Sequence, residues 1–181
     1  MNPATPLPAT LIGDVCRDVG PALILLTGTR SAGKTRWCGE LVRTARAARL
    51  HVAGLLSPPV FEGGRKTAID LVDLTTGERR RLAERPSPGL TGMAGLGWRF
   101  DLAVLAWANA RLARLAACDL LVIDELGPLE FRGEGGFAAA FTQLDARRYR
   151  LAVAVVRPEL LHAAQIRWPW CSGIFATKDR T

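Results

Sequence analysis

Residues 23–35 constrain the fold of this chain more than any other stretch. They read Leu-Ile-Leu-Leu-Thr-Gly-Thr-Arg-Ser-Ala-Gly-Lys-Thr, which is an apolar strand followed by Gly-x-x-x-x-Gly-Lys-Thr. A helical pattern begins directly after it. This order of strand, loop and helix is the context that a phosphate-binding P-loop requires. The sequence therefore predicts a nucleotide site built at the end of a buried strand.

The spacing within this loop assigns a role to each of its key residues. Gly28 and Gly33 let the backbone turn tightly, so that its N–H groups converge on the β-phosphate. Lys34 is expected to reach the β- and γ-oxygens, and the Thr35 hydroxyl is expected to bind Mg²⁺. The predicted nucleotide-binding residues are Gly28, Thr29, Arg30, Ser31, Ala32, Gly33, Lys34, Thr35 and Arg36.

A second apolar run ends in two acids. Residues 120–125 read Leu-Leu-Val-Ile-Asp-Glu, and downstream of a P-loop this looks like a Walker B element. Asp124 is expected to hold Mg²⁺, directly or through water. Glu125 is expected to orient and partly deprotonate the water that attacks the γ-phosphate. An acid directly after the aspartate favours hydrolysis over phosphoryl transfer to a small metabolite.

Strands and helices alternate along the chain. Strands are predicted at 22–27, 52–56, 120–125, 151–156 and 172–177, and helices at 34–50, 102–116, 137–144 and 160–166. Asp101 is expected to cap the second of these helices, whose apolar stripe would contain Leu102, Leu105, Leu112 and Leu115. Continuously apolar strands are typical of a parallel sheet covered on both faces. The predicted class is α/β, a three-layer P-loop NTPase fold with a mostly parallel central sheet and an added β-hairpin.

Turn-forming residues dominate the stretch between residues 57 and 99. Prolines and glycines at 57–65 and the turn signal Thr-Thr-Gly-Glu at 75–78 predict a β-hairpin over 57–83, beside the parallel sheet. Residues 84–99 are rich in proline and glycine. A loop of this length in a compact domain is usually functional, and we expect a lid over the nucleotide.

Length and composition predict one cytoplasmic domain. The chain has 181 residues, read as an N-terminal tail over 1–20 and a single domain over 21–181. No apolar run approaches the ~20 residues that cross a bilayer, and no secretory signal is present, so no membrane contact is expected. Four scattered cysteines lack metal or redox spacing and are expected to be buried hydrophobes: Cys16, Cys38, Cys118 and Cys171.

The net charge of +7 comes largely from arginine clusters at 79–81 and at 147, 148 and 150. Such clusters form either a surface for nucleic acid or a solvated basic face. Aromatic residues are not interleaved with them, as a base-stacking surface would require. A solvated face is therefore favoured, and nucleic acid stays a possible partner.

Residues 123–130, Ile-Asp-Glu-Leu-Gly-Pro-Leu-Glu, resemble the signature Asp-Glu-hydrophobic-Gly-x-hydrophobic-Glu of a family. This is the small P-loop nucleoside-triphosphatase family of bacteria and archaea, whose human member is the cancer-related nucleoside triphosphatase. Residues 54–58, 62–65 and 69–78 resemble the hairpin of that family, and the likeness covers about 22–156. It implies Mg²⁺-dependent hydrolysis of ATP, GTP, CTP and UTP to diphosphates, with broad base specificity and slow turnover. It also implies phosphate and metal contacts for Gly28, Gly33, Lys34 and Thr35, with Asp124 and Glu125 serving metal and water.

A cation is expected to neutralise charge on the γ-phosphate in the transition state. The candidates are Arg65, Arg99 and Arg157. Arg157 is ranked first, because it follows a buried strand and so falls on the same sheet edge as the P-loop and Glu125. The predicted catalytic residues are thus Lys34, Glu125 and Arg157, with Thr35 and Asp124 for the metal.

Two other functions stay open at this point. One is a small-molecule kinase that uses ATP, in which the loop over 84–99 covers an acceptor. The other is a binding module in which bound nucleotide controls the affinity for RNA or a partner protein. The basic charge is the only sequence feature that favours this second alternative.

Overall fold

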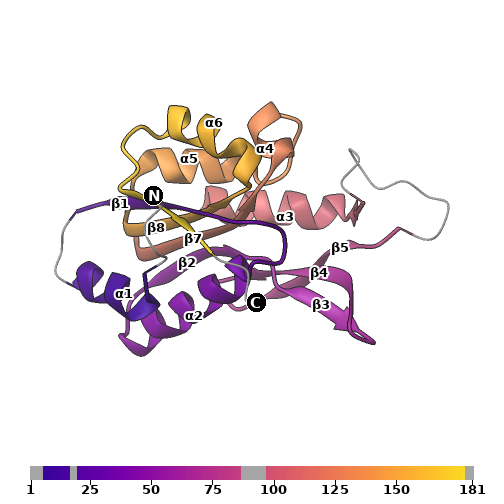
Figure 1. Cartoon of the computed structure of the whole chain (residues 1–181), viewed down its shortest axis with the longest axis horizontal. Helices are drawn as coiled ribbons and strands as arrows, with labels where there is room; N and C mark the ends of the chain where they lie inside the picture. The colour runs from indigo at the N-terminus through magenta and orange to yellow at the C-terminus, as the bar shows by residue number, and fades with distance from the viewer. Residues whose placement is uncertain (1–5, 17–19, 87–96, 178–181) are drawn as a thin grey trace.

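The computed structural model of this chain describes residues 6–16, 20–86 and 97–177. These residues form one nine-stranded sheet with helices packed on both of its faces (Figure 1). The strand order is β6-β5-β4-β2-β7-β8-β1-β9, and β3 pairs with β4 outside this path. The predicted α/β class with a mostly parallel sheet is confirmed.

The parallel part of the sheet holds five strands. They are β1 (Ala22–Thr27), β2 (Val52–Leu56), β7 (Cys118–Leu126), β8 (Tyr149–Val156) and β9 (Gly173–Ala176). β1 lies between β8 and β9, and β7 lies between β2 and β8. The carboxyl ends of these strands therefore meet at one edge, which is where ligands bind in open α/β sheets.

Successive residues of β1 point to two separate cores. Ile24 and Leu26 pack with α1 (Pro8–Cys16) and α2 (Lys34–Ala47). Leu23 and Leu25 belong to the second core, on the opposite face of the sheet. That core is covered by α3 (Leu102–Ala113), α5 (Ala138–Ala146) and α6 (Leu161–Arg167). Helix, sheet and helix are thus the three predicted layers (Figure 1).

Helix α1 lies within the stretch predicted as an N-terminal tail. Its Ile12 and Val15 are buried in the same core as residues of α2. This part of the predicted tail is therefore packed on the domain, because two apolar side chains one turn apart give the short helix an inward face.

An antiparallel extension continues the sheet beyond β2. It consists of β3 (Pro59–Glu62), β4 (Arg65–Asp73), β5 (Arg79–Glu84) and β6 (Arg99–Phe100). β4 pairs with β2 through Leu55 with Asp73 and Leu56 with Val72. The predicted hairpin over 57–83 is present, and it contains a further strand in β3. Most of the loop predicted as a lid, 87–96, lies outside the described residues.

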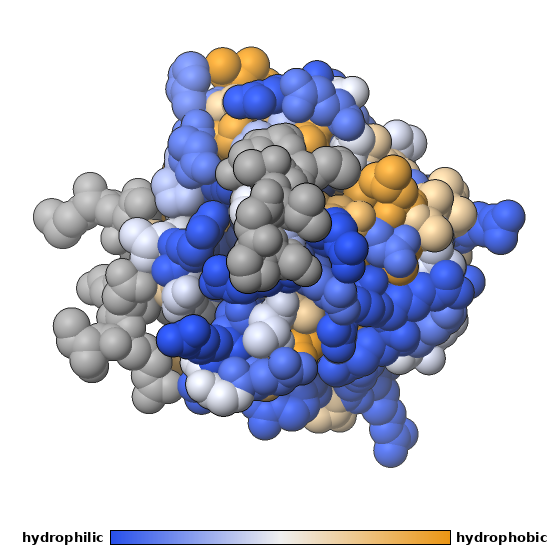
Figure 2. Space-filling view, turned by 90° about the vertical axis from the view of Figure 1, so that its right-hand side faces the viewer, coloured by the Kyte–Doolittle hydropathy of each residue, from blue (hydrophilic) through white to orange (hydrophobic). Residues whose placement is uncertain are grey.

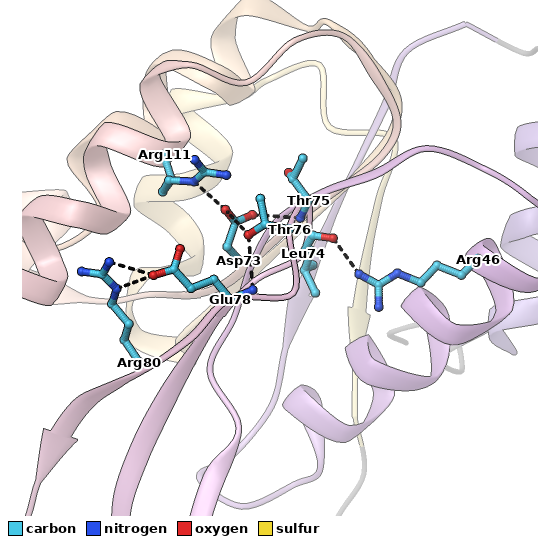
Figure 3. A network of polar contacts seen from close by, with 8 residues as sticks. All are labelled: Arg46, Asp73, Leu74, Thr75, Thr76, Glu78, Arg80 and Arg111. Atoms are coloured by element: carbon cyan, nitrogen blue, oxygen red, sulfur yellow. Dashed lines mark hydrogen bonds and ion pairs between the residues drawn. The ribbon is translucent and has the colours of Figure 1, made fainter.

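The turn between β4 and β5 is tied to two helices (Figure 3). Asp73 is 1% exposed, accepts hydrogen bonds from Thr75 N and the Thr76 hydroxyl, and forms an ion pair with Arg111 of α3 at 2.6 Å. Arg46 of α2 donates to Leu74 O at 2.6 Å. Helices on both faces of the sheet therefore hold one end of the extension.

Helix α3 begins where the sequence predicts. Asp101 is its N-cap, and its carboxylate accepts hydrogen bonds from Ala103 N and Val104 N. The predicted apolar stripe is wrong at its first member, because Leu102 is 63% exposed. The residues of α3 that are buried are Val104, Leu105, Ala108 and Leu112.

Three cysteines have described side chains. Cys38, Cys118 and Cys171 are free thiols, the first buried and the other two partly buried. Burial raises the pKa of Cys118 to about 11, so this thiol is held neutral at pH 7. Helices in the described part of the chain are all too short or too polar to cross a membrane.

Candidate functional site

The loop after β1 has the backbone conformation that close anion binding needs. Gly28 has φ +140°, and a Cβ added there would lie 2.6 Å from Thr177 Oγ1, at the end of β9. Gly33 has φ +85° at the N-cap of α2, in the left-handed region that favours glycine. Both glycines of the motif are therefore required by the geometry, one by a neighbouring strand and one by the start of the helix.

Lys34 folds back over this loop. Its side chain is buried, and its ammonium donates to Gly28 O and Thr29 O, each at 2.8 Å. These bonds hold a positive charge at the mouth of the loop, where a phosphate would replace the two carbonyl oxygens. The other predicted loop residues differ in exposure. Thr29, Arg30, Ser31 and Gly33 are exposed and Ala32 is buried, whereas Arg36 points outward to an ion pair with Glu40.

Asp124 lies beneath the loop at the end of β7. It is 1% exposed, accepts from Ser57 N at 3.1 Å, and is hydrogen-bonded to the Thr35 side chain. The Ser57 hydroxyl donates to the carbonyl oxygen of Asp124. Burial raises the pKa of Asp124 to about 7, with a further increase from Glu125, against these hydrogen bonds and the charge of Lys34.

The surroundings of Asp124 fit a magnesium ion. A carboxylate and a hydroxyl lie side by side, both are hard oxygen donors, and a divalent cation would offset the cost of burying the carboxylate. The described residues contain no group of three or more His, Cys, Asp or Glu side chains that could hold a metal on their own. Mg²⁺ commonly takes only one or two protein ligands and completes its shell with phosphate and water.

The structure brings the predicted base and the first-ranked cation together. Arg157 Nε lies 2.7 Å from Glu125 Oε1, and the two side chains are 28% and 31% exposed. Arg157 follows β8, which is the neighbour of β7 in the sheet. The expectation that the two residues share a sheet edge is therefore confirmed. Their direct ion pair was not foreseen.

The other two candidate arginines lie apart from the acidic pair. Arg65 is exposed at the start of β4. Arg99 is also exposed and forms an ion pair with Glu84 at 3.3 Å. The residue beside Arg65 is different, because Lys66 is partly buried and its charge interacts with those of Glu125 and Asp124. Strand alternation is the sequence signal that could have separated Lys66 from Arg65.

Glu130 is a second residue whose position the sequence did not assign. It is 8% exposed in the short helix α4 (Pro128–Arg132), and it accepts from Gly127 N and Phe137 N, each at 2.8 Å. The carboxylate therefore clamps the segment that follows Glu125. Burial raises its pKa, and these hydrogen bonds and the charge of Arg157 oppose the increase. Its place as the last acid of the motif over 123–130 was the available signal.

The face of the molecule on the hairpin side is mainly hydrophilic, with small hydrophobic areas (Figure 2). Such a surface suits a charged, hydrated ligand better than an apolar one.

Comparisons with known proteins agree with this geometry. A family model described as NTPase matches residues 23–167. A nucleoside-triphosphatase THEP1 from Ignicoccus hospitalis is 32% identical over 162 residues, which cover 86% of this chain and 88% of that protein. One from Methanopyrus kandleri is 29% identical over 143 residues, covering 78% and 77%. The solution structure of a human cancer-related nucleoside triphosphatase has the same fold, with a TM-score of 0.64 at 23% identity over 88% and 90% of the two chains.

Proposed function

Because the chain belongs to the NTPase family, we propose that it hydrolyses nucleoside 5′-triphosphates to the diphosphate and phosphate. One observation carries this proposal. The phosphate loop, the buried Asp124 and the partly exposed Glu125 lie at one sheet edge, with Lys34 folded over the loop. A loop alone would bind nucleotide, whereas the added acid supplies a group that can take a proton from water.

The reaction assigns a task to each residue. The oxygen of a water molecule attacks the γ-phosphorus, and the bond from phosphorus to the β–γ bridging oxygen breaks. Glu125 accepts the proton of that water, and Lys34 and Arg157 stabilise the charge that spreads over the phosphate oxygens. The ion pair with Arg157 orients the carboxylate of Glu125 before the nucleotide binds. Nucleotide binding then gives Arg157 a second anion to contact.

Mg²⁺ dependence is part of the proposal. Thr35 and Asp124 would hold the ion, which would neutralise charge on the phosphate oxygens when bound. The substrates are ATP, GTP, CTP and UTP, with broad base specificity and slow turnover, as the family resemblance implies. We further propose that residues 21–181, with helix α1 packed on them, are one domain acting in the cytoplasm.

Release of phosphate from the four triphosphates tests the proposal directly. Wild type would be measured with Mg²⁺ beside Glu125→Gln, which keeps the size of the side chain and removes the base. We expect slow release from all four by wild type. The variant should still bind MgATP and should hydrolyse it at least ~100-fold more slowly.

Glu62→Gln is the matched control, because Glu62 is exposed at the end of β3. It should release phosphate at the wild-type rate. A Glu125→Gln rate near that of wild type would contradict the role of this base. Absence of release by wild type that still binds MgATP would contradict hydrolysis and favour a kinase that lacks its acceptor.

A further inference from the structure

Lys66 lies outside every motif discussed so far, yet it is placed beside the site. It is in β4, where it pairs with Phe61 of β3. The β3–β4 hairpin projects on the same side of the molecule as the loop after β1 (Figure 1). The chain enters this hairpin through Ser57, which donates to Asp124. The hairpin is therefore fixed at its base to the acidic end of β7.

Aromatic and backbone contacts hold Lys66 in place. Its ammonium lies 5.1 Å from the centre of the Trp98 ring. Arg85 donates from Nε to the Lys66 carbonyl oxygen at 2.8 Å, and its guanidinium lies 5.3 Å from the same ring. Cation–π contacts of this kind orient a charge without neutralising it. The positive charge of Lys66 thus remains available to an anion.

The site charges around Lys66 come from two separate segments of the chain, the phosphate loop and the end of β7. Burial lowers its pKa, whereas the carboxylates of Glu125 and Asp124 raise it, and Arg30 of the phosphate loop lowers it further. Residues 30, 124 and 125 are those that the sequence assigns to phosphate, metal and water. Together with the hydrogen bond from Ser57 to Asp124 at the base of the hairpin, these charges place Lys66 beside the end of β7, on the side of the phosphate loop. A partly desolvated ammonium gains strongly from a charge-assisted hydrogen bond to phosphate.

Two other candidate cations, Arg65 and Arg157, differ from Lys66 in their placement. Neighbouring residues of a strand point to opposite faces, so Arg65 cannot share the direction of Lys66, and it is exposed. Arg157, which the proposed function already places at the phosphate, is bonded to Glu125 at 2.7 Å, so Lys66 would add a cation and not replace it.

We propose that Lys66 is a catalytic residue whose ammonium binds the γ-phosphate of the nucleoside triphosphate. Lys34 approaches the phosphates from the loop after β1, and Lys66 approaches from the hairpin. Two cations on different elements would surround the oxygens on which charge develops. This proposal rests on the proposed function, because it assigns a residue to the same site.

The test compares the affinities of the protein for a non-hydrolysable ATP analogue and for ADP, both with Mg²⁺. Lys66→Met keeps the aliphatic stem on Trp98 and removes the charge. It should lower the preference for the triphosphate by about 10- to 100-fold and leave ADP affinity unchanged, which also shows that the variant is folded. Lys66→Arg should restore part of the preference. Arg65→Met, the matched control, should keep the wild-type preference.

An unchanged preference in Lys66→Met overturns the proposal, and so does an equal loss in Arg65→Met. The affinity ratio needs no turnover, so it decides the role of Lys66 even if wild type releases no phosphate. Release by wild type together with an unchanged ratio refutes the Lys66 contact alone. Absence of release together with a lowered ratio refutes hydrolysis alone.

Discussion

At the scale of single residues, the charged groups of the site already form hydrogen bonds and an ion pair within the protein. The Lys34 ammonium is bonded to two loop carbonyls, and Glu125 is bonded to Arg157. Each group is therefore oriented before any ligand arrives, which lowers the conformational cost of binding. The triphosphate would offer the Lys34 ammonium a stronger partner, because charge-assisted bonds to phosphate exceed bonds to neutral carbonyls.

Replacing Lys34 by alanine should weaken binding and turnover together. The ammonium is the buried cation of the loop, and its loss removes charge-assisted hydrogen bonds to the β- and γ-oxygens. We expect MgATP affinity to fall about 10- to 100-fold and phosphate release to fall at least as far. Titration calorimetry and a phosphate-release assay measure the two effects.

Arg43→Ala is the control for this substitution. Arg43 is exposed on the same helix, so its removal changes the net charge equally and should leave affinity and rate at their wild-type values. Turnover retained in Lys34→Ala would show that the loop does not hold the nucleotide as proposed.

Sequence reasoning proposes site residues where the chemistry depends on local spacing. Lys34, Asp124 and Glu125 belong to short motifs, so a few neighbouring letters place them. Lys66 and Ser57 were missed as site residues, because their relation to Asp124 depends on how a hairpin some 60 residues away in sequence folds back. Only the alternation of side chains along β4 could have singled out Lys66 in advance.

At the scale of elements, the buried strands were predictable and the short exposed ones were not. β1 and β2 have the predicted bounds, since a continuous apolar run between polar residues limits them. β3 has only partly or fully exposed residues, and β6 is two residues long. Their pairing is decided by β4 and β5, not by their own residues. Helix α4 is not among the predicted helices, because it is five residues long and starts at Gly127-Pro128, a pair that is also typical of turns.

The turn between β4 and β5 should depend on Asp73. Asp73→Asn removes the ion pair with Arg111 from a buried position, and we expect a loss of about 1–3 kcal/mol in the free energy of unfolding at pH 7. Burial raises the pKa of Asp73, but bonds from Thr75, Arg111 and Thr76 outweigh it, so the net pKa is lowered. Urea denaturation of both proteins measures the difference.

The lowered pKa fixes the direction of the pH dependence. A carboxylate of this kind contributes stability above its unfolded pKa and loses it as pH falls through the folded value. The difference in the free energy of unfolding between wild type and Asp73→Asn should therefore persist at pH 6–7 and shrink below about pH 4. Glu78→Gln in the same turn should have little effect, because its ion pair with Arg80 is exposed. A difference that grows on acidification would contradict the assigned contact.

At the scale of the whole molecule, several arginines of the two basic clusters form ion pairs within the protein. Arg79 and Arg81 pair with Asp70, and Arg80 pairs with Glu78 and lies 4.5 Å from the Trp107 ring. In the other cluster, Arg150 pairs with Asp119 at 3.3 Å. An arginine of these clusters would have to give up its ion pair in order to bind the phosphate of a nucleic acid. These ion pairs support the prediction that the arginine clusters form a solvated basic face and not a nucleic-acid surface.

RNA binding should accordingly be weak. Fluorescence anisotropy with a single-stranded RNA at about 0.15 M salt should give a Kd weaker than about 10 μM, with and without MgATP. Submicromolar affinity that falls steeply with salt and changes with nucleotide would contradict this expectation and favour the binding module.

The sheet order has a consequence for synthesis of the protein. β1 is made early, at residues 22–27, but its two sheet partners β8 and β9 are Tyr149–Val156 and Gly173–Ala176. A ribosome must therefore add more than 100 residues after β1 before this apolar strand can be paired on either side. Until then the strand is exposed to aggregation. Thr177, which lies against Gly28 of the phosphate loop, is made after β8 and β9, so the newborn chain cannot complete this nucleotide site before residue 177 has been added.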